Sequence, residues 1–212
     1  MKYLLILSCL LFTSVSWSKD INSDDLEKRD GLYYEKYADV PFTGNVTGKK
    51  QGKISKGKRE GEWLEYFDTG QLKWKGNYKY GKQEGVEVLF KYWDNGQLKL
   101  KSNYKDYKRD GENLQYYKNG QLKFKINYKD DQQEDEELWY YENGQLDKIG
   151  NWKKGKREGE WTNYYRNGDI YEKKNYKNGK FDGEWLVYDE NGKLLIHEIY
   201  KDGELIETII EP

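Results

Sequence analysis

The strongest constraint on the fold is a glycine that returns at a nearly constant interval through most of the chain. The intervals between these glycines are 26, 24, 24, 24 and 24 residues, and an aromatic residue stands eight positions after each of them. The glycines are Gly70, Gly96, Gly120, Gly144, Gly168 and Gly192, and the aromatic residues are Tyr78, Tyr104, Tyr128, Trp152, Tyr176 and Tyr200. Such a period predicts supersecondary units that stack into one array.

Each unit contains two segments with the composition of strands, at residues 62–67 and 71–78 in the first copy. Most copies place Asn-Gly between the two segments, as at Asn95-Gly96, which predicts a two-residue type I′ turn with positive φ at both residues. A second turn, as at Tyr80-Gly81, joins successive units. We therefore predict an all-β fold, a single elongated antiparallel β-meander of roughly twelve to fourteen strands built from tandem hairpins of about 24 residues.

A two-residue turn also predicts the register of each hairpin. One face would pair Phe67 with Leu72, Glu65 with Trp74, Trp63 with Gly76 and Gly61 with Tyr78, and the other Tyr66 with Lys73, Leu64 with Lys75 and Glu62 with Asn77. The first face is aromatic, and the second carries aliphatic, tyrosine and lysine side chains. We expect the Tyr78 ring to lie over Gly61, because glycine leaves the backbone bare.

The ends of the chain differ from the repeats. Lys2, an apolar run over residues 3–15 and the small residues Ser16 and Ser18 predict a secretory signal peptide over residues 1–18. A retained anchor, or a lipoprotein modified at Cys9, are the alternatives. We expect a flexible leader at 19–30, N-terminal cap strands at 31–55, the repeat array at 56–203 and a C-terminal cap strand at 204–212. The protein would then be exported to the periplasm, the cell surface or the medium.

Composition limits the classes of function. Charged residues make up 35% of the chain, and the mean hydropathy is −1.18, as in many disordered chains. Aromatic residues make up 17%, however, which favours a thin sheet that buries rings. The net charge of −1 argues against a nucleic-acid partner, because nucleic-acid-binding domains are clearly basic.

The sequence contains little catalytic chemistry. The single histidine, His197, lies in an apolar strand and is interpreted as a packing residue, and the single cysteine, Cys9, lies in the predicted signal peptide. No phosphate-binding, zinc-protease or nucleophile-elbow motif occurs. We therefore predict no catalytic residue, no metal site and no cofactor. A carboxylate-dependent hydrolase stays open as a minor alternative, because acidic residues are plentiful.

Lysine and tyrosine recur at fixed places in the units and predict a binding stripe. Its members are Lys73, Lys75, Lys99, Lys101, Lys123, Lys125, Tyr66, Tyr116, Tyr140 and Tyr164. Such a stripe would suit anionic lipid headgroups, an acidic protein face or a polysaccharide. Cross-strand pairs that only keep the sheet soluble explain the same pattern.

Three irregularities interrupt the repetition. The second unit has two extra residues between Gly85 and Gly96, which predicts a longer strand or a bulge. Residues 130–137 (DDQQEDEE) are acidic, and Asp135 replaces the glycine that corresponds to Gly61. This segment predicts either a widened acidic loop with a role or a degenerate solvated turn. The last hairpin is rich in aliphatic residues, which indicates an edge-closing cap or an exposed docking edge.

The repeated unit has the pattern G-E-W-x-x-Y-Y-x-N-G-x-L followed by N-Y-K-x-G-K-x-x-G, best seen at 159–168 and 175–183. It resembles the MORN repeat variant found in the bacterial YwqK-type antitoxins of toxin–antitoxin systems. The resemblance covers about residues 31–206 and implies an all-β repeat sheet with interaction roles and no catalytic residues. Our leading hypothesis is an exported protein–protein interaction module, antitoxin-like or immunity-like. The alternative is a protein that binds a cell-envelope glycan or lipid headgroup.

Overall fold

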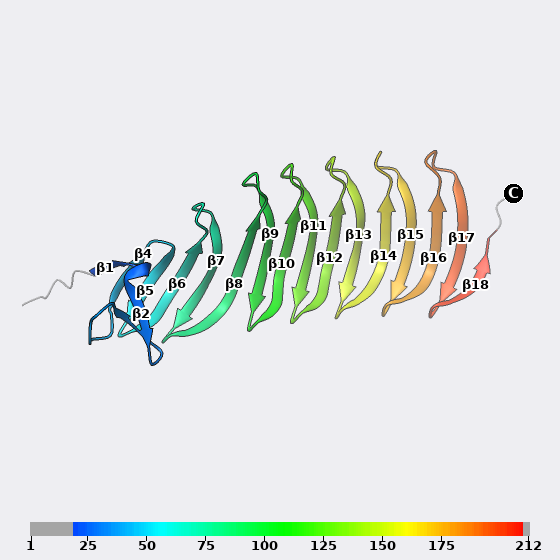
Figure 1. The fold of residues 1–212 in the computed structure, drawn as a ribbon. Coiled ribbons are helices and arrows are strands. Elements are labelled where there is room, and N and C mark those ends of the chain that lie inside the picture. Colours follow the sequence, from blue (N-terminus) through cyan, green and yellow to red (C-terminus); the bar gives the residue numbers. More distant parts are fainter. Residues whose placement is uncertain (1–18, 210–212) are drawn as a thin grey trace, which may run out of the picture.

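The computed structural model describes residues 19–209, which form one long sheet with a small subdomain at its N-terminal end (Figure 1). Sixteen strands belong to this sheet and follow chain order, except that β1 lies beside β4. All neighbours are antiparallel apart from the parallel pair of β1 and β4. The predicted all-β meander of tandem hairpins is therefore confirmed, with more strands than expected. The predicted signal peptide lies outside the described residues.

The elements have the following bounds. The N-terminal subdomain contains β1 (Lys19–Asn22), the 3-10 helix η1 (Ser23–Asp25), β2 (Leu26–Arg29), β3 (Leu32–Glu35), β4 (Gly44–Thr47) and β5 (Lys50–Ser55). The six hairpins of the array are β6 (Lys58–Tyr66) with β7 (Leu72–Lys79), β8 (Lys82–Tyr92) with β9 (Leu98–Lys105), β10 (Lys108–Tyr116) with β11 (Leu122–Lys129), β12 (Gln132–Tyr140) with β13 (Leu146–Lys153), β14 (Lys156–Tyr164) with β15 (Ile170–Lys177), and β16 (Lys180–Tyr188) with β17 (Leu194–Lys201). β18 (Glu204–Thr208) ends the sheet. No helix among residues 19–209 is long and apolar enough to cross a membrane.

The loop inside each hairpin differs from the expected type I′ turn. In the first hairpin the Phe67 N–H donates to the Gln71 carbonyl (2.8 Å) and the Gly70 N–H donates to the Phe67 carbonyl (2.9 Å). The loop therefore has three residues, and among them only Gly70 has a positive φ, of 82°. This geometry is a type I turn closed by a glycine in the left-handed region. These loops line one edge of the sheet, the loop edge, at the top of Figure 1.

The asparagine of the Asn-Gly pair has a different role from the one expected. The Asn95 side-chain oxygen accepts a hydrogen bond from the Gln97 N–H (3.1 Å), and its amide nitrogen donates to the Lys118 carbonyl in the next hairpin (2.8 Å). Asn119 donates in the same way to the Glu142 carbonyl (2.9 Å). Asparagine thus connects neighbouring loops through its side chain.

Type I′ geometry occurs instead at the opposite edge, where successive hairpins join. Tyr80 and Gly81 have φ of 52° and 80°, and they lie between the directly paired residues Lys79 and Lys82. Equivalent two-residue turns line the lower edge of the sheet in Figure 1, which we call the turn edge. Two positive φ values in succession are what a tight turn between twisted strands requires.

The predicted register is right in the middle of each hairpin and wrong next to the loop. Gly61 pairs with Tyr78, Trp63 with Gly76 and Glu65 with Trp74, as expected. Tyr66, however, pairs with Leu72 instead of Lys73, because the longer loop shifts the pairing by one residue. A β-bulge at Lys73 restores the register, and a bulge changes the direction of its side chains.

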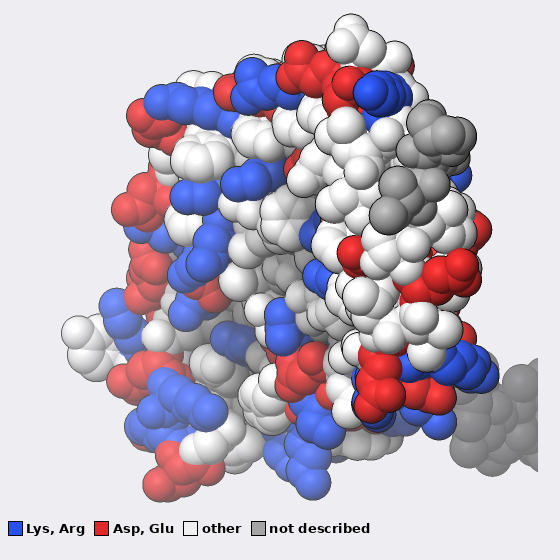
Figure 2. Space-filling view, turned by 90° about the vertical axis from the view of Figure 1, so that its right-hand side faces the viewer, with Lys and Arg blue, Asp and Glu red and all other residues white. Residues whose placement is uncertain are grey.

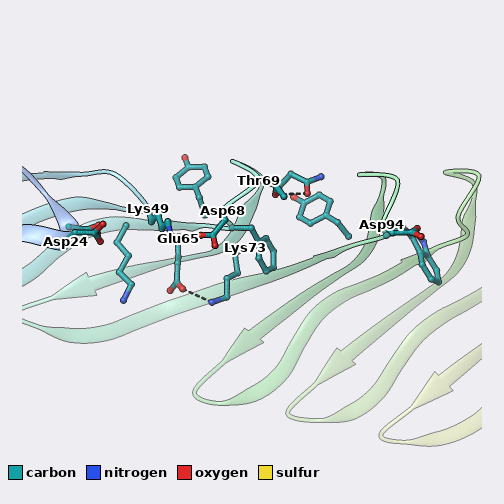
Figure 3. A pocket seen from close by; sticks show the side chains of 14 residues that line it. Asp24, Lys49, Glu65, Asp68, Thr69, Lys73 and Asp94 are labelled. Carbon is teal, nitrogen blue, oxygen red and sulfur yellow. Dashed lines mark hydrogen bonds and ion pairs between the residues drawn. The ribbon is translucent and has the colours of Figure 1, made fainter.

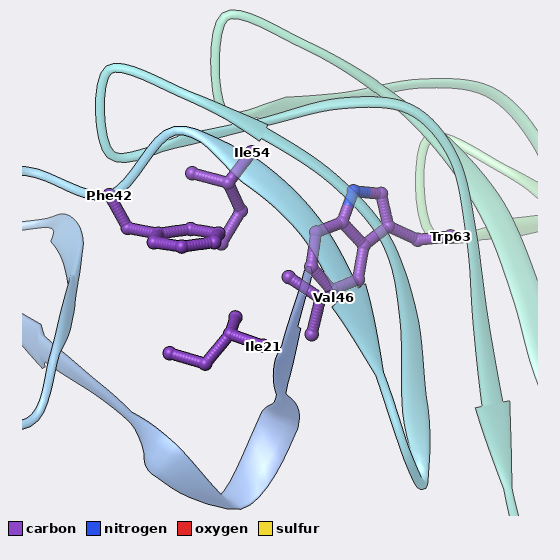
Figure 4. Packing of buried hydrophobic residues seen from close by; sticks show 5 residues of the cluster. All are labelled: Ile21, Phe42, Val46, Ile54 and Trp63. Atoms are coloured by element: carbon purple, nitrogen blue, oxygen red, sulfur yellow. The ribbon is translucent and has the colours of Figure 1, made fainter. Parts of the chain in front are cut away.

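The segment at 19–30, expected to be a flexible leader, is instead folded as β1, η1 and β2. Its apolar residues explain the difference, because Ile21 is buried with Phe42, Val46, Ile54 and Trp63 in a compact cluster (Figure 4). Leu26 packs against the same cluster. The N-terminal end of the sheet is therefore closed by an apolar core.

The C-terminal end is not closed in this way. All residues of β18 are exposed, including Leu205 and Ile206, and β18 pairs only with β17 among the described residues. The expected C-terminal cap strand is present as a strand at 204–208, but all of its residues are exposed, so it buries no apolar core. Its side chains lie on an outermost strand, where the sheet supplies neighbours on one side only.

Two of the three sequence irregularities have simple outcomes. β8 has 11 residues where β6 and β10 have 9, so the extra residues lengthen a strand. The acidic segment forms an ordinary two-residue turn at Asp130-Asp131 followed by β12, so the widened loop is wrong. Asp135 adopts a φ of 61°, and so takes over the backbone role of the glycine that it replaces.

Candidate interaction surface

The predicted stripe does not lie on one face of the sheet. We call the face that carries Trp63, Trp74, Trp139, Trp161 and Trp185 the aromatic face. Lys73 occupies the bulge and contacts Glu65 on this face, with 2.7 Å between Nζ and Oε1. Lys99 lies 4.1 Å from the Trp93 ring centre, and Lys123 lies 5.5 Å from that of Tyr117. The bulge thus turns one row of lysines away from the other row.

The second row lies on the opposite face, together with the tyrosines. Lys75 pairs with Leu64, and both Lys101 and Lys125 pair with Leu114. The tyrosines pair with aliphatic residues next to the loop edge, as Tyr66 with Leu72, Tyr116 with Leu122, Tyr140 with Leu146 and Tyr164 with Ile170. A hollow of about 840 Å³ lined by Tyr164, Ile170, Lys173 and Tyr188 confirms that these residue types share a surface.

Carboxylates accompany the lysines on both faces. Lys101 and Lys125 both approach Glu112, with Nζ–Oε distances of 3.9 and 3.6 Å, and Lys173 approaches Glu160 at 3.7 Å. Figure 2, which looks onto the C-terminal end of the array, shows basic and acidic side chains interspersed around a hollowed surface. Half-exposed pairs of this kind contribute little to stability. They do mean that the array presents mixed charge instead of a continuous basic row.

The repeat glycines have roles different from the one predicted. A Cβ on Gly61 would meet no atom within 4 Å, so no ring lies over it, and its φ of 68° is the reason for glycine. Rings cover other glycines, since a Cβ on Gly150 would stand 2.1 Å from Trp161, and one on Gly52 would stand 2.5 Å from Trp63. The Tyr78 ring instead meets Trp63 edge-on, with 6.4 Å between ring centres.

A buried carboxylate, which sequence reasoning missed, lies at the centre of the aromatic face. Glu137 is 3% exposed and accepts hydrogen bonds from the indole N–H of Trp139 (2.5 Å) and of Trp152 (2.6 Å). The Lys148 ammonium lies 2.8 Å from the same carboxylate, and Gln133 donates to it (3.2 Å). Donors therefore surround a charge that would otherwise be costly to bury.

A second buried carboxylate follows on β15. Glu172 accepts from the Trp185 indole (2.8 Å) and the Asn163 amide (2.7 Å), and the Lys174 ammonium lies 2.7 Å away. One signal in the sequence could have revealed both sites. Glu137 stands seven positions before its turn glycine, where Trp63 and Trp161 stand in other units. Glu172 stands four positions after its turn glycine, where Trp74 and Phe124 stand, so each acid occupies a position that is aromatic in other units.

Tyrosine hydroxyls fasten each hairpin to the next along the loop edge. Tyr117, Tyr141 and Tyr165 donate to the carbonyls of residues 140, 164 and 188, at 2.8, 2.6 and 2.8 Å. Burial raises the pKa of the Tyr117 and Tyr141 hydroxyls, so they remain protonated donors over the physiological range. The array therefore presents its surface side chains at regular and well-held spacing.

A groove lies where the N-terminal subdomain meets the first hairpins (Figure 3). Its volume is about 660 Å³, and its walls include η1, the first two loops and the aromatic residues Tyr66, Phe67, Tyr92 and Trp93. The Lys49 ammonium hydrogen-bonds Asp68 (2.5 Å) and lowers the pKa of that carboxyl, while the same contact raises the pKa of Lys49. The groove is thus aromatic with paired charges at its rim.

The described residues carry no group of three or more His, Cys, Asp or Glu side chains that could hold a metal ion. His197, interpreted from the sequence as a packing residue, has a polar contact, because its Nε2 lies 3.2 Å from the Glu184 carboxylate.

Comparison with known proteins gives one family. The model described as the MORN repeat variant matches residues 59–80, 88–106, 109–130, 136–154, 157–178 and 181–202, which is more than half of the chain. Each matched segment falls on one hairpin of the array, from β6–β7 to β16–β17. None of the curated proteins compared with the chain matches it.

Proposed function

We propose that this chain, which belongs to the MORN repeat variant family, is an exported and non-catalytic interaction protein whose partner is another protein. The pairing of charges carries the proposal. The lysines are divided between two faces, and Lys73, Lys101 and Lys125 lie beside carboxylates. An anionic lipid surface favours a contiguous basic cluster. Aromatic side chains are instead enriched in the cores of protein interfaces, which a polar rim surrounds.

Export is supported by the pattern of residues 1–18. Cleavage after Ser18 would remove none of the strands that the structure describes, including β1 with its partner β4. Intact mass measurement of the protein recovered from its native cells tests this step. A chain that begins at Lys19 is expected, and a chain that keeps residues 1–18 would contradict signal-peptide removal.

The resemblance to YwqK-type antitoxins indicates a class of partner. For an exported chain, the partner would be a protein toxin that arrives from outside or acts at the cell surface. Challenge of cells with and without the chain by purified envelope-acting toxins tests this finer proposal. Protection by the full chain, lost when the array is deleted, is expected. Equal survival would remove the antitoxin-like role and leave the general interaction role standing.

Capture with residues 19–212 as bait, from envelope and culture fractions at extracellular salt, tests the general proposal. Two triple variants make a matched pair, because Lys73, Lys99 and Lys123 to Glu, and Lys75, Lys101 and Lys125 to Glu, change the same charge on opposite faces. Recovery of one protein that is lost with only one variant would locate the binding face. Recovery of no specific protein by the parent bait would count against the proposal.

A second candidate function rests on the groove of Figure 3. Its aromatic residues and polar rim suit an envelope glycan, whose sugar rings pack on aromatic side chains while hydroxyls bond polar groups. Binding to purified peptidoglycan and other envelope glycans, compared between the parent and Tyr66→Ala with Trp93→Ala, tests it. Unchanged binding in the double variant, or no binding by the parent, would exclude this groove as a glycan site.

A further inference from the structure

Two tyrosines are exposed in consecutive turns of the turn edge. Tyr80, in the turn between β7 and β8, is 70% exposed, and Tyr107, between β9 and β10, is 88% exposed. Both turns lie at the lower edge of the sheet in Figure 1. Neither side chain takes part in an aromatic contact or a side-chain hydrogen bond among the described residues. The fold itself gains little from either ring.

The backbone makes Tyr107 the more informative of the two. It stands at the second position of its turn with a φ of 64°, in the left-handed region where a Cβ crowds the following carbonyl. Most turns of this edge have glycine at the same position, namely Gly57, Gly81, Gly155, Gly179 and Gly203. A large side chain thus stands at a turn position whose backbone conformation favours glycine.

Asp131 is the other residue that replaces glycine at this turn position, and a hydrogen-bonded contact offsets its backbone strain. Asp131 has a φ of 67° at the equivalent position, and its carboxylate accepts from the Arg109 N–H (2.9 Å) and from Arg109 Nε (3.3 Å). A contact within the chain therefore explains Asp131. The exposed ring of Tyr107 has no such contact among the described residues, so no side-chain interaction offsets the strain of its turn.

Lysines surround the two tyrosines. Lys79 pairs directly with Lys82, and Lys105 with Lys108, which places like charges opposite each other across both turns. Lys108 lies 3.8 Å from Asp130, whereas Lys79, Lys82 and Lys105 make no ion pair among residues 19–209. Four lysines therefore flank the two turns, and Asp106 is the one acidic residue within the turns themselves.

A hollow lies between the same two turns. It has a volume of about 370 Å³, and its lining includes Tyr78, Gln83, Glu87, Asp106 and Tyr107. It occurs beside β8, which is two residues longer than β6. The exposed rings, the unpaired lysines and the hollow thus coincide at the place where the repetition is interrupted.

We propose that Tyr80 and Tyr107, with Lys79, Lys82 and Lys105, anchor a protein partner that presents an acidic surface with room for two phenol rings. The proposal rests on the protein-binding function above and names its surface. Tyrosine is enriched among the residues that dominate binding, because it supplies a large contact area with few rotatable bonds. Unpaired lysines at the rim speed association with an acidic partner.

Site-specific photo-crosslinking tests the location. A benzophenone amino acid replaces Tyr80, Tyr107 or, as a control on the aromatic face, Tyr171, in residues 19–212. The variants are irradiated with envelope and culture fractions of the producing cells, and adducts are identified by mass spectrometry. The expected result is adducts to one and the same protein from positions 80 and 107, with none from position 171.

Affinity and stability measurements on the identified protein separate binding from folding. Tyr107→Gly is expected to raise the unfolding midpoint by about 2–4 °C, because strain is removed, and to weaken binding at least about 10-fold. Tyr80→Ser should weaken binding comparably. Tyr37→Ser is the matched control, because Tyr37 is 98% exposed with a φ of 67° but lies in the N-terminal subdomain. It should leave the affinity unchanged.

The outcomes distinguish this proposal from the general function. Adducts only from position 171, or an unchanged affinity of Tyr107→Gly, would overturn the tyrosine surface and leave protein binding standing. No adduct from any position would overturn the tyrosine surface, and the capture experiment with the parent bait then decides whether protein binding stands. Binding of the parent, but not of Tyr107→Gly, to vesicles of phosphatidylcholine with phosphatidylglycerol, without protein adducts, would overturn the proposal in favour of a lipid surface.

Discussion

Residues 56–63 and 154–161 have the same sequence, KGKREGEW, and the structure places them in two different environments. Their local structures agree closely. The Trp63 and Trp161 indoles donate to the carbonyls of Lys53 and Asn151, both at 3.2 Å. Each copy also directs an arginine to a tyrosine hydroxyl, at 3.1 Å for Arg59 with Tyr78 and 2.9 Å for Arg157 with Tyr176. The octapeptide thus makes the same local contacts in both copies.

The surroundings of the two copies differ. Trp63 is 2% exposed and packs in the apolar cluster with Ile54 and Val46. Trp161 is 4% exposed, meets Trp152 edge-on with 5.3 Å between ring centres, and has the Lys148 ammonium 5.6 Å from its ring. Apolar residues of the N-terminal subdomain cover the first copy, whereas an indole and an ammonium group from β13 lie beside the second. Identical local sequence is therefore compatible with two kinds of core.

The largest expected effect comes from removal of the two indoles. Trp63→Ala should lower the free energy of unfolding by about 4 kcal/mol and Trp161→Ala by about 3 kcal/mol. The apolar cluster beside Trp63 leaves a largely apolar cavity, whereas at Trp161 water can enter beside the Lys148 ammonium. Urea denaturation followed by far-ultraviolet circular dichroism measures both. Tyr171→Ala, at an exposed position, is the control, and a larger loss at Trp161 than at Trp63 would break the comparison.

The next effect concerns the charges of the second environment. Glu137→Leu should cost about 3 kcal/mol, because it leaves the Lys148 ammonium and two indole N–H groups without their acceptor. The double variant with Lys148→Met should recover much of this loss, since an apolar pair needs no acceptor. A double-mutant cycle in urea measures the coupling. A coupling near zero would show that the pair does not act as a unit.

Substitution of two glycines near the second copy gives a smaller effect. Gly150→Ala should cost about 2 kcal/mol, because its Cβ would overlap the Trp161 ring. Gly159→Ala should cost about 1 kcal/mol through its φ of 69° alone, since the space beside it is open. Thermal unfolding of both variants and of the parent measures which substitution lowers the stability more. Equal losses would mean that the ring moves aside without penalty.

The smallest effect is on pH dependence next to the first hairpin, at the pair of Lys49 and Asp68. The hydrogen bond from Lys49 lowers the pKa of Asp68 below its ordinary value of 3.8, so the stability contributed by this exposed pair is present above that value and is lost as the pH falls through the lowered pKa. Lys49→Met should raise the pKa of Asp68 towards 3.8. Carbon-detected nuclear magnetic resonance of the carboxyl measures it, and an unchanged pKa would show that the pair does not form in solution.

Much of the fold follows from local signals, and the candidate surface does not. The period, the hairpins and the central register of Gly61 with Tyr78 are readable because turns and strand alternation are local. The side on which Lys73 lies is not readable, because a loop longer by one residue adds a bulge that changes its face. The sequence gives the identity of Tyr107 but not its backbone conformation, so the strain of its positive φ can be recognised only in the structure.

The repeated octapeptide shows which features follow from local sequence and which depend on tertiary structure. By itself the sequence determines the backbone of each copy, since the φ values of its glycines and the bonds of its tryptophan and arginine recur at both places. Only the tertiary structure decides what covers the indole. Ile21 and Phe42 reach Trp63 from the folded N-terminal segment, while Trp152 and Lys148 reach Trp161 from β13. Burial depends on residues brought together from a distance, and a local pattern does not contain that information.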